Sequence, residues 1–126
     1  MNMRKNILVI DDEELVTKSL VLLLHSEGYT TTVAKSGQQA LEKVRGNDYD
    51  LIICDVRMPG VDGVEVIKQI RAYLRESNRK QIPEILITGY ADSDKYDRAM
   101  ALRVVDYLYK PFENDELLRV VKNTIG

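Results

Sequence analysis

The chain has 126 residues, 44% of them hydrophobic, which suits one domain with a core of ordinary size. A net charge of −2 offers no clustered excess of Lys and Arg, so we expect no direct binding to nucleic acid. The single cysteine, Cys54, excludes an intramolecular disulfide and a cysteine-based zinc site, and it favours a reducing, cytoplasmic setting. No apolar run reaches the length of a signal-peptide core or a membrane span, so we expect a soluble protein without membrane contact.

Short apolar runs alternate along the chain with segments whose apolar residues recur at helical spacing. In chain order, the predicted elements are a strand at 6–10, a helix at 14–27, a strand at 29–34, a helix at 36–46, a strand at 51–55, a helix at 62–74, a strand at 82–88, a helix at 91–102, a strand at 104–109 and a helix at 113–125. Five strands alternating with five helices predict an α/β fold, a doubly wound five-stranded parallel sheet, in one domain over residues 1–126.

Three local signals indicate where helices begin or end. Ser36 with Gln39, and Asp62 with Glu65, have the spacing of capping boxes, so each pair predicts a helix start. Gly28 follows the first helix at the position of a left-handed cap. The helix at 91–102 is the weakest of the five because it has few apolar residues to bury, and we expect it to move.

Polar side chains stand at the ends of four predicted strands. Asp11 and Asp12 follow the first strand, and Asp55 ends the third. Thr88 ends the fourth strand, and Lys110 follows the fifth. In an open parallel sheet the carboxyl ends of the strands border the crevice where ligands bind, so these side chains are expected to lie together.

Three carboxylates in one crevice repel each other. At a separation of about 4 Å and an effective dielectric constant of about 20, each pair costs roughly 4 kcal/mol. Such a cluster therefore keeps a proton or holds a cation. All available ligands are hard oxygens with no cluster of His or Cys, which indicates Mg²⁺ or Mn²⁺ rather than zinc.

The residues at these strand ends resemble the receiver domain of two-component response regulators, and the resemblance covers essentially the whole chain: Asp11-Asp12, Asp55, Thr88 and Lys110-Pro111. It implies the flavodoxin-like receiver fold with strand order 2-1-3-4-5. It also implies that Asp55 is the phosphoacceptor. Asp12 and Asp55 would bind Mg²⁺ with the backbone carbonyl of Arg57, while Asp11 would act mainly through water.

The resemblance further assigns a switch. Thr88 and Lys110 would hold the phosphoryl oxygens. Thr88 would move toward the phosphate, and Tyr107 would swing inward to fill the space behind it. Simple packing is an equally good interpretation of Tyr107. In this family the Lys110-Pro111 bond is typically cis.

The implied function is a phosphorylation-controlled signalling switch in a phosphorelay. A sensor histidine kinase or phosphotransfer protein would donate the phosphoryl group, and water would later remove it. The domain would assist its own phosphorylation and dephosphorylation and would not be an enzyme in any further sense. The fourth helix, fifth strand and fifth helix would signal to a downstream output protein or a fused output domain, with a phosphorylation-dependent homodimer as a further partner.

Arg57 and Tyr90 flank the path of the attacking water. Both are bulky, so we expect slow autodephosphorylation. By contrast, we expect His25 to be a surface residue and Cys54 a buried structural thiol. The remaining cations near the third helix are expected to form a solvated face without a partner: Arg71, Arg75, Arg79 and Lys80.

Three other functions remain as alternatives. The first is a Mg²⁺-dependent phosphotransferase or phosphatase for a small molecule, although Arg57 stands where a second acid/base carboxylate would be wanted. The second is a flavin-binding module, although no Ser/Thr/Gly-rich phosphate loop follows the first strand. The third is a receiver-like interaction module that is never phosphorylated.

Overall fold

The structure is a computed structural model, and it describes residues 4–126. Five of its strands form the main sheet: β1 (Asn6–Ile10), β2 (Thr30–Ala34), β3 (Leu51–Asp55), β6 (Glu84–Thr88) and β7 (Asp106–Tyr109). All pair in parallel, in the order β2-β1-β3-β6-β7. Counted in chain order within this sheet, that is the expected order 2-1-3-4-5. The fold prediction is therefore confirmed.

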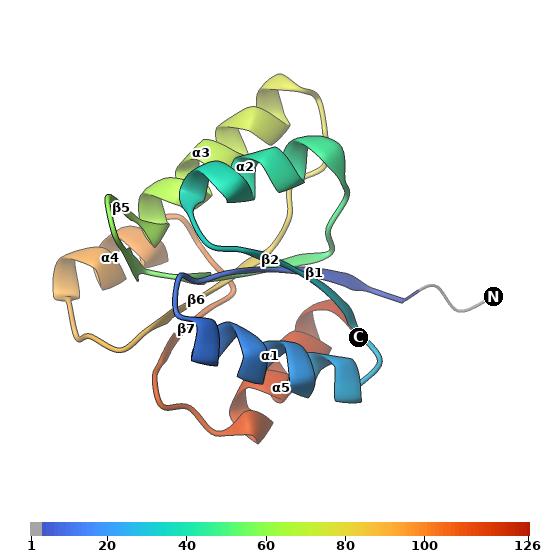
Figure 1. The fold of residues 1–126 in the computed structure, drawn as a ribbon. Helices are drawn as coiled ribbons and strands as arrows, with labels where there is room; N and C mark the ends of the chain where they lie inside the picture. Colours follow the sequence, from blue (N-terminus) through green and yellow to red (C-terminus); the bar gives the residue numbers. More distant parts are fainter. Residues whose placement is uncertain (1–3) are drawn as a thin grey trace.

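Helices cover both faces of the sheet, as Figure 1 shows. The five helices are α1 (Glu14–Ser26), α2 (Gly37–Gly46), α3 (Gly63–Glu76), α4 (Ser93–Ala101) and α5 (Asn114–Ile125). In Figure 1, α1 and α5 lie on one side of the strands, and α2, α3 and α4 on the other. Gly28 follows α1 with φ +88°, the left-handed cap that the sequence predicted. Within residues 4–126, no helix is both long and apolar enough to cross a membrane.

The sheet separates two apolar cores. Along β1, Leu8 and Ile10 pack with residues of α2 and α3, whereas Ile7 and Val9 pack with residues of α1 and α5. Side chains alternate along a strand, so each strand contributes to both cores. This explains why the strands are continuous apolar runs rather than alternating patterns.

Two strands begin two residues later than the sequence predicted. β6 begins at Glu84 rather than residue 82 because Pro83 has no N–H to donate, although its carbonyl accepts from Ile52 N at 3.0 Å. β7 begins at Asp106 rather than residue 104. Val104 N instead donates to a carbonyl of α4, that of Ala99, at 3.5 Å and belongs to the turn that ends this helix.

A short antiparallel hairpin follows β3, and the sequence did not predict it. Its strands are β4 (Arg57–Met58) and β5 (Val61–Asp62), joined by Pro59 and Gly60. Gly60 has φ +84°, which only glycine adopts readily, and proline before glycine is typical of a type II turn. The hairpin folds the chain back so that α3 begins beside the end of β3.

Both predicted capping residues cap their helices. Ser36 Oγ accepts from Gln39 N at 3.1 Å, and Asp62 Oδ1 accepts from Glu65 N at 2.9 Å. The reciprocal half of the Asp62 box does not form. Glu65 pairs instead with Arg98 of α4, at 3.0 Å from Nη2 to Oε2. An ion pair therefore links the N-terminal turn of α3 to α4.

Candidate functional site

Three carboxylates meet at the carboxyl edge of the sheet. Asp55 ends β3, and Asp11 and Asp12 follow the neighbouring β1. One oxygen from each lies within 4.8 Å of the other two. Asp11 and Asp55 are 0% and 2% exposed, whereas Asp12 is open to solvent. Two carboxylates of the cluster are therefore buried, and the third, that of Asp12, is exposed to solvent.

Lys110 reaches this cluster from the end of β7. Its Nζ lies 3.1 Å from Asp11 Oδ2 and 3.6 Å from Asp55 Oδ2. It also lies 3.2 Å from Glu13 Oε1, a partner that sequence reasoning missed. The signal was present, since Glu13 continues the acidic run after β1. The Lys110-Pro111 peptide bond is cis, as expected.

The environment shifts the proton affinities of this cluster. Burial raises the pKa of Asp55 from 3.8 to about 7, with the charge of Asp11 adding to the rise and Lys110 opposing it. For Lys110, burial disfavours the charged form, but the hydrogen bond and charge of Asp11 outweigh it and raise the pKa. One ammonium does not neutralise the crevice, so Asp55 holds a proton to near neutral pH.

These residues can hold a metal ion. The crevice offers three carboxylates against one lysine, and a divalent cation relieves the remaining repulsion more fully than a proton does. The donor atoms are all hard oxygens. Arg57 N donates to Asp55 Oδ1 at 3.4 Å, which holds the start of β4 against the cluster.

Thr88 closes the site from β6. It is 1% exposed, and its Oγ1 accepts from Tyr90 N at 3.2 Å. Lys110 N donates to the Thr88 carbonyl at 2.7 Å, so the hydroxyl and the ammonium come from paired strand ends. All five side chains expected at the strand ends therefore lie at one edge of the sheet.

Tyr107 already occupies a buried position in β7. It is 6% exposed, and its ring lies edge-on to Tyr96 at 5.2 Å and to Tyr109 at 5.5 Å between centroids. Its hydroxyl has no hydrogen-bond partner among the described residues. An inward swing coupled to Thr88 stays a prediction.

Gly63 is a positioning residue that the sequence analysis did not single out. A Cβ at this position would lie 2.1 Å from the backbone oxygen of Asp55 and 2.9 Å from Val56 Cα. Gly63 N donates to the Val56 carbonyl at 2.6 Å. Only glycine lets α3 begin this close to the acidic strand end. The Asp62-Gly63 pair after the turn was the available signal.

Arg57 and Tyr90 lie against one another beside the acidic crevice. The Arg57 guanidinium carbon is 4.0 Å from the centroid of the Tyr90 ring, a cation–π contact. Each follows a site residue by two positions, Asp55 and Thr88 respectively. The pair that we expected to shield the site is therefore in mutual contact.

Two residues set aside on sequence grounds lie where they were expected, one in the core and one on the surface. Cys54 is fully buried in the core, and burial raises the pKa of its thiol. His25 lies on the surface, with Nε2 2.9 Å from Thr31 Oγ1. The expected solvated face without a partner is wrong for Arg71, which pairs with the buried Glu84, and for Arg79, which pairs with Asp48.

A doubly wound parallel sheet with carboxylates, a hydroxyl and a lysine at its carboxyl edge defines a receiver-type signalling domain. Comparison with known families agrees, since the model of the response regulator receiver domain matches residues 7–122. The chain belongs to this family, the receiver domains of two-component response regulators. Receiver domains are signalling domains, so the small-molecule phosphotransferase and phosphatase alternatives are not favoured.

Individual relatives support this membership. The chain is 35% identical over 125 residues to the transcriptional regulatory protein FixJ of Bradyrhizobium diazoefficiens, covering 99% of this chain and 58% of FixJ. It matches a receiver protein structure from Pseudomonas putida with TM-score 0.88 and 30% identity, covering 98% and 99% of the two chains. It also matches TrrA of Thermotoga maritima, solved in complex with Mg²⁺–BeF, with TM-score 0.81, 36% identity and coverage of 95% and 98%. The chain spans 58% or less of the first curated relatives it matches.

Proposed function

We propose that this chain is a phosphorylation-controlled switch that accepts a phosphoryl group on Asp55. This proposal rests on the burial of Asp55 between Asp11 and Lys110. The Asp55 carboxylate has other carboxylates around it and the Lys110 ammonium beside it. In the reaction, an Asp55 oxygen attacks the phosphorus of a phosphohistidine. The new O–P bond forms as the P–N bond breaks, and the departing imidazole takes up a proton. Water later cleaves the acyl phosphate and releases inorganic phosphate.

The surrounding residues have distinct roles in this proposal. Asp12, Asp55 and the Arg57 carbonyl would hold Mg²⁺, with Asp11 acting mainly through water. The bound ion supplies positive charge that offsets the phosphoryl oxygens. Lys110 leaves its contacts with the carboxylates to bind a phosphoryl oxygen, and Thr88 donates its hydroxyl to another. A related receiver, TrrA of Thermotoga maritima, was solved with Mg²⁺–BeF, which supports a divalent ion at this kind of site.

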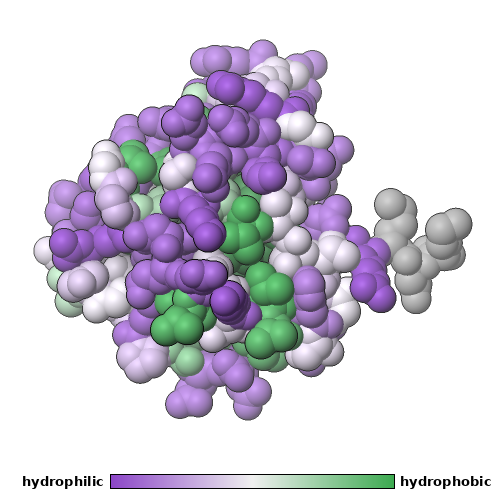
Figure 2. Space-filling model, in the orientation of Figure 1, coloured by the Kyte–Doolittle hydropathy of each residue, from purple (hydrophilic) through white to green (hydrophobic). Residues whose placement is uncertain are grey.

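The donor would be a sensor histidine kinase or a phosphotransfer protein that docks on α1. An apolar groove of about 560 Å³ runs between α1 and the segment after β7, lined in part by Leu15, Phe112 and Lys110. Lys110 belongs to both the groove and the acidic cluster, so a donor seated here has its histidine close to Asp55. Leu15 and Leu22 are 81% and 73% exposed, and Figure 2 shows hydrophobic side chains over the region of α1.

The output surface would be formed by α4, β7 and α5. Few residues anchor α4, since Ala99 is the only one of its nine residues that is buried. Its ionic links to α3 and to the N-cap of α3 are Arg98 to Glu65 at 3.0 Å, Arg98 to Asp62 at 3.4 Å and Lys95 to Asp62 at 3.6 Å. Solvent-exposed apolar side chains here include Tyr96, Met100, Val105 and Tyr109. Such a surface suits a downstream output protein, a fused output domain or a second phosphorylated copy.

Intact mass spectrometry after incubation with acetyl phosphate and Mg²⁺ tests the proposal. The wild type is expected to gain one phosphoryl group, and Asp55→Asn none. Asp97→Asn, the same change at an exposed position of α4, serves as the control and should be labelled like the wild type. Labelling of Asp55→Asn, or labelling of the wild type that persists in EDTA, would refute it.

Light scattering before and after the same treatment tests the output surface. Phosphorylation is expected to raise the molar mass toward that of a dimer in the wild type. Tyr109→Ser, a change on β7 away from the donor groove, is expected to keep labelling and lose the dimer. A dimer that forms equally without phosphate would contradict control by phosphorylation.

A further inference from the structure

The inward face of α4 carries charge where most helices carry apolar side chains. Tyr96 adds an edge-on contact with Tyr107, at 5.2 Å between ring centroids, but is itself 39% exposed. A face of this composition buries little apolar surface, so ion pairs supply part of its attachment. Between residues 91 and 102, five positions are not exposed, and they recur at helical spacing: Asp92, Lys95, Arg98, Ala99 and Leu102.

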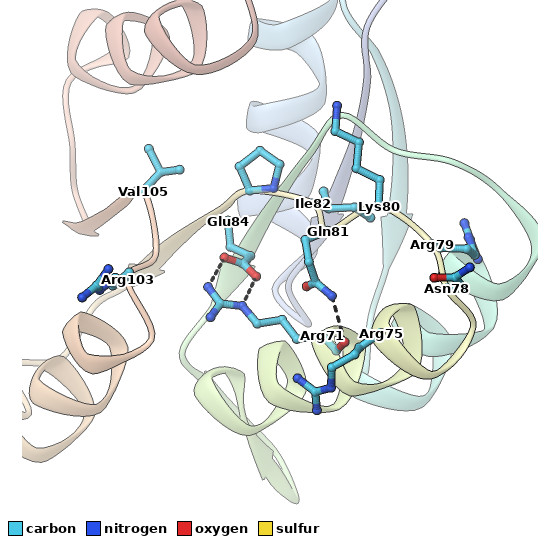
Figure 3. A pocket seen from close by; sticks show the side chains of 11 residues that line it. Arg71, Arg75, Asn78, Arg79, Lys80, Gln81, Ile82, Glu84, Arg103 and Val105 are labelled. Atoms are coloured by element: carbon cyan, nitrogen blue, oxygen red, sulfur yellow. Dashed lines mark hydrogen bonds and ion pairs between the residues drawn. The ribbon is translucent and has the colours of Figure 1, made fainter.

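The C-terminal end of α4 is fixed by a junction with α3 and β6. Arg71 of α3 forms a two-pronged pair with Glu84, at 2.7 Å for both contacts, as Figure 3 shows. The same guanidinium donates to the Leu102 carbonyl at 2.6 Å. Val105 N donates to the Glu84 carbonyl at 2.7 Å. Because Glu84 is 2% exposed, this junction is shielded from water and holds the end of α4 firmly.

The rest of α4 is held to the start of α3 by partly exposed ion pairs. Asp62 Oδ2 lies 3.6 Å from Lys95 Nζ and 3.4 Å from Arg98 Nη1. Arg98 Nη2 also lies 3.0 Å from Glu65 Oε2. The side chains of Asp62, Lys95 and Arg98 are between 22% and 31% exposed. The two ends of α4 are therefore attached by different means, a shielded junction at one end and charges within reach of water at the other.

The two oxygens of Asp62 have separate tasks. Oδ1 accepts from Glu65 N and caps α3, whereas Oδ2 faces the cations of α4. Burial favours the protonated form of Asp62, but the hydrogen bond from Glu65 N and the charges of α4 outweigh it and lower its pKa. The charge of this side chain can therefore be removed while the cap is kept.

Asp62 also belongs to the hairpin that touches the acidic cluster. It pairs with Arg57 across β4 and β5, and Arg57 N donates to Asp55 Oδ1 at 3.4 Å. The next residue, Gly63, lies so close to the end of β3 that a Cβ would stand 2.1 Å from the Asp55 carbonyl oxygen. A shift of this tightly packed hairpin at the cluster therefore moves the Asp62 carboxylate relative to α4.

We propose that Asp62 is a charge latch, which holds the N-terminal half of α4 on α3 and releases it when the hairpin shifts at the acidic cluster. Because the C-terminal end is fixed at Leu102, α4 then pivots about that end. Partly exposed ion pairs suit this role, since water and salt replace them at small cost. The route passes through the hairpin and is separate from Thr88 and Tyr107. Release by the cluster rests on the proposed function, whereas the latch itself does not.

Hydrogen–deuterium exchange of the unphosphorylated protein, followed by mass spectrometry, tests the latch. Asp62→Asn removes the charge but keeps the cap, because Asn caps helices about as well as Asp does. Amides of α4 are expected to exchange about three- to tenfold faster, as for the loss of two partly exposed ion pairs. The start of α3 should keep its protection. Asp97→Asn removes an exposed carboxylate of α4 itself and should leave exchange unchanged.

Two further measurements distinguish a latch from general loosening. High salt should narrow the difference between the wild type and Asp62→Asn, because it screens the pairs that only the wild type has. Arg98→Gln should also speed exchange in α4. Adding Asp62→Asn to it should then have a smaller effect than in the wild type, since the two residues act through each other. Unchanged α4 exchange in Asp62→Asn, equal loosening in Asp97→Asn, or full additivity with Arg98→Gln would overturn the latch.

Acetyl phosphate with Mg²⁺ tests the release. It should speed exchange of α4 in the wild type and add little in Asp62→Asn, where the latch is already open. Intact mass of the same samples reports labelling of the protein. Absence of labelling contradicts the proposed function and the release step, while exchange of the unphosphorylated protein still decides the latch. A labelled wild type with unchanged α4 exchange, or an equal rise in both proteins, would show that the hairpin does not release α4.

Discussion

Replacing Asp55 with Asn is expected to stabilise the metal-free protein, although it removes the proposed phosphoacceptor. Asp55 is 2% exposed, and burial, with the charge of Asp11 adding to it, raises its pKa from 3.8 to about 7. At about 1.4 kcal/mol for each tenfold change in proton affinity, the ionised carboxylate costs the folded state about 4 kcal/mol at pH 8. A neutral amide avoids most of this cost. We expect the free energy of unfolding to rise by about 2 to 4 kcal/mol.

Urea unfolding in EDTA, followed by circular dichroism because the chain has no tryptophan, measures this effect. The folded state keeps the Asp55 proton up to about pH 7, whereas the unfolded chain releases it near the ordinary value of 3.8. The folded wild type therefore binds more protons between these values, and its stability should fall as pH rises from about 4 to 8. That fall should be reduced in Asp55→Asn.

In Mg²⁺ the order of stability should reverse, with the wild type more stable than Asp55→Asn. An ion that binds the folded carboxylate cluster stabilises the wild type by mass action, and Asp55→Asn should gain less because one ligand is lost. Asp97→Asn, at an exposed position, should change stability by less than about 0.5 kcal/mol under all conditions. If Asp55→Asn in EDTA at pH 8 is no more stable than the wild type, then burial of the ionised Asp55 carboxylate does not destabilise the fold.

Three further predictions concern packing, a buried ion pair and shielding of the site. Gly63→Ala places a Cβ 2.1 Å from a backbone oxygen at the end of β3, so urea unfolding should show a loss of about 2 to 4 kcal/mol. Arg71→Ala leaves the carboxylate of Glu84, which is 2% exposed, without its partner and should cost about 3 to 5 kcal/mol in the same assay. Arg57→Ala and Tyr90→Ala each open the cation–π contact beside the site, so phosphate should be lost several-fold faster in a time course of intact mass.

Matched variants make these results interpretable. Gly46→Ala adds a Cβ with nothing within 4 Å and should leave stability nearly unchanged. Arg119→Ala removes an exposed guanidinium without a buried partner and should cost less than about 0.5 kcal/mol. An unchanged dephosphorylation rate in both Arg57→Ala and Tyr90→Ala would dispose of the shielding idea, and a Gly63→Ala protein as stable as Gly46→Ala would contradict the close approach of α3.

The order of elements and the edge that carries the site were readable from the sequence. Continuous apolar runs alternating with helical periodicity require a parallel sheet covered on both faces, and polar residues after such runs must collect at its carboxyl edge. Asp11, Asp55, Thr88 and Lys110 were placed by this reasoning alone. The order of the strands could not be predicted in this way, because periodicity indicates that a strand is buried but not which strand lies beside it. That order came from the family resemblance.

The tertiary structure decided what depends on residues far apart in the chain. Lys110 meets Asp11 across 99 positions, and that contact, together with burial, sets the proton affinity of the site. Gly63 matters because the hairpin returns the chain to the end of β3, which no local pattern reveals. Arg71 meets both Glu84 and the Leu102 carbonyl only because α4 ends beside the start of β6. Short-range sequence signals determine which elements form, whereas distances and charges in a site arise from how those elements pack.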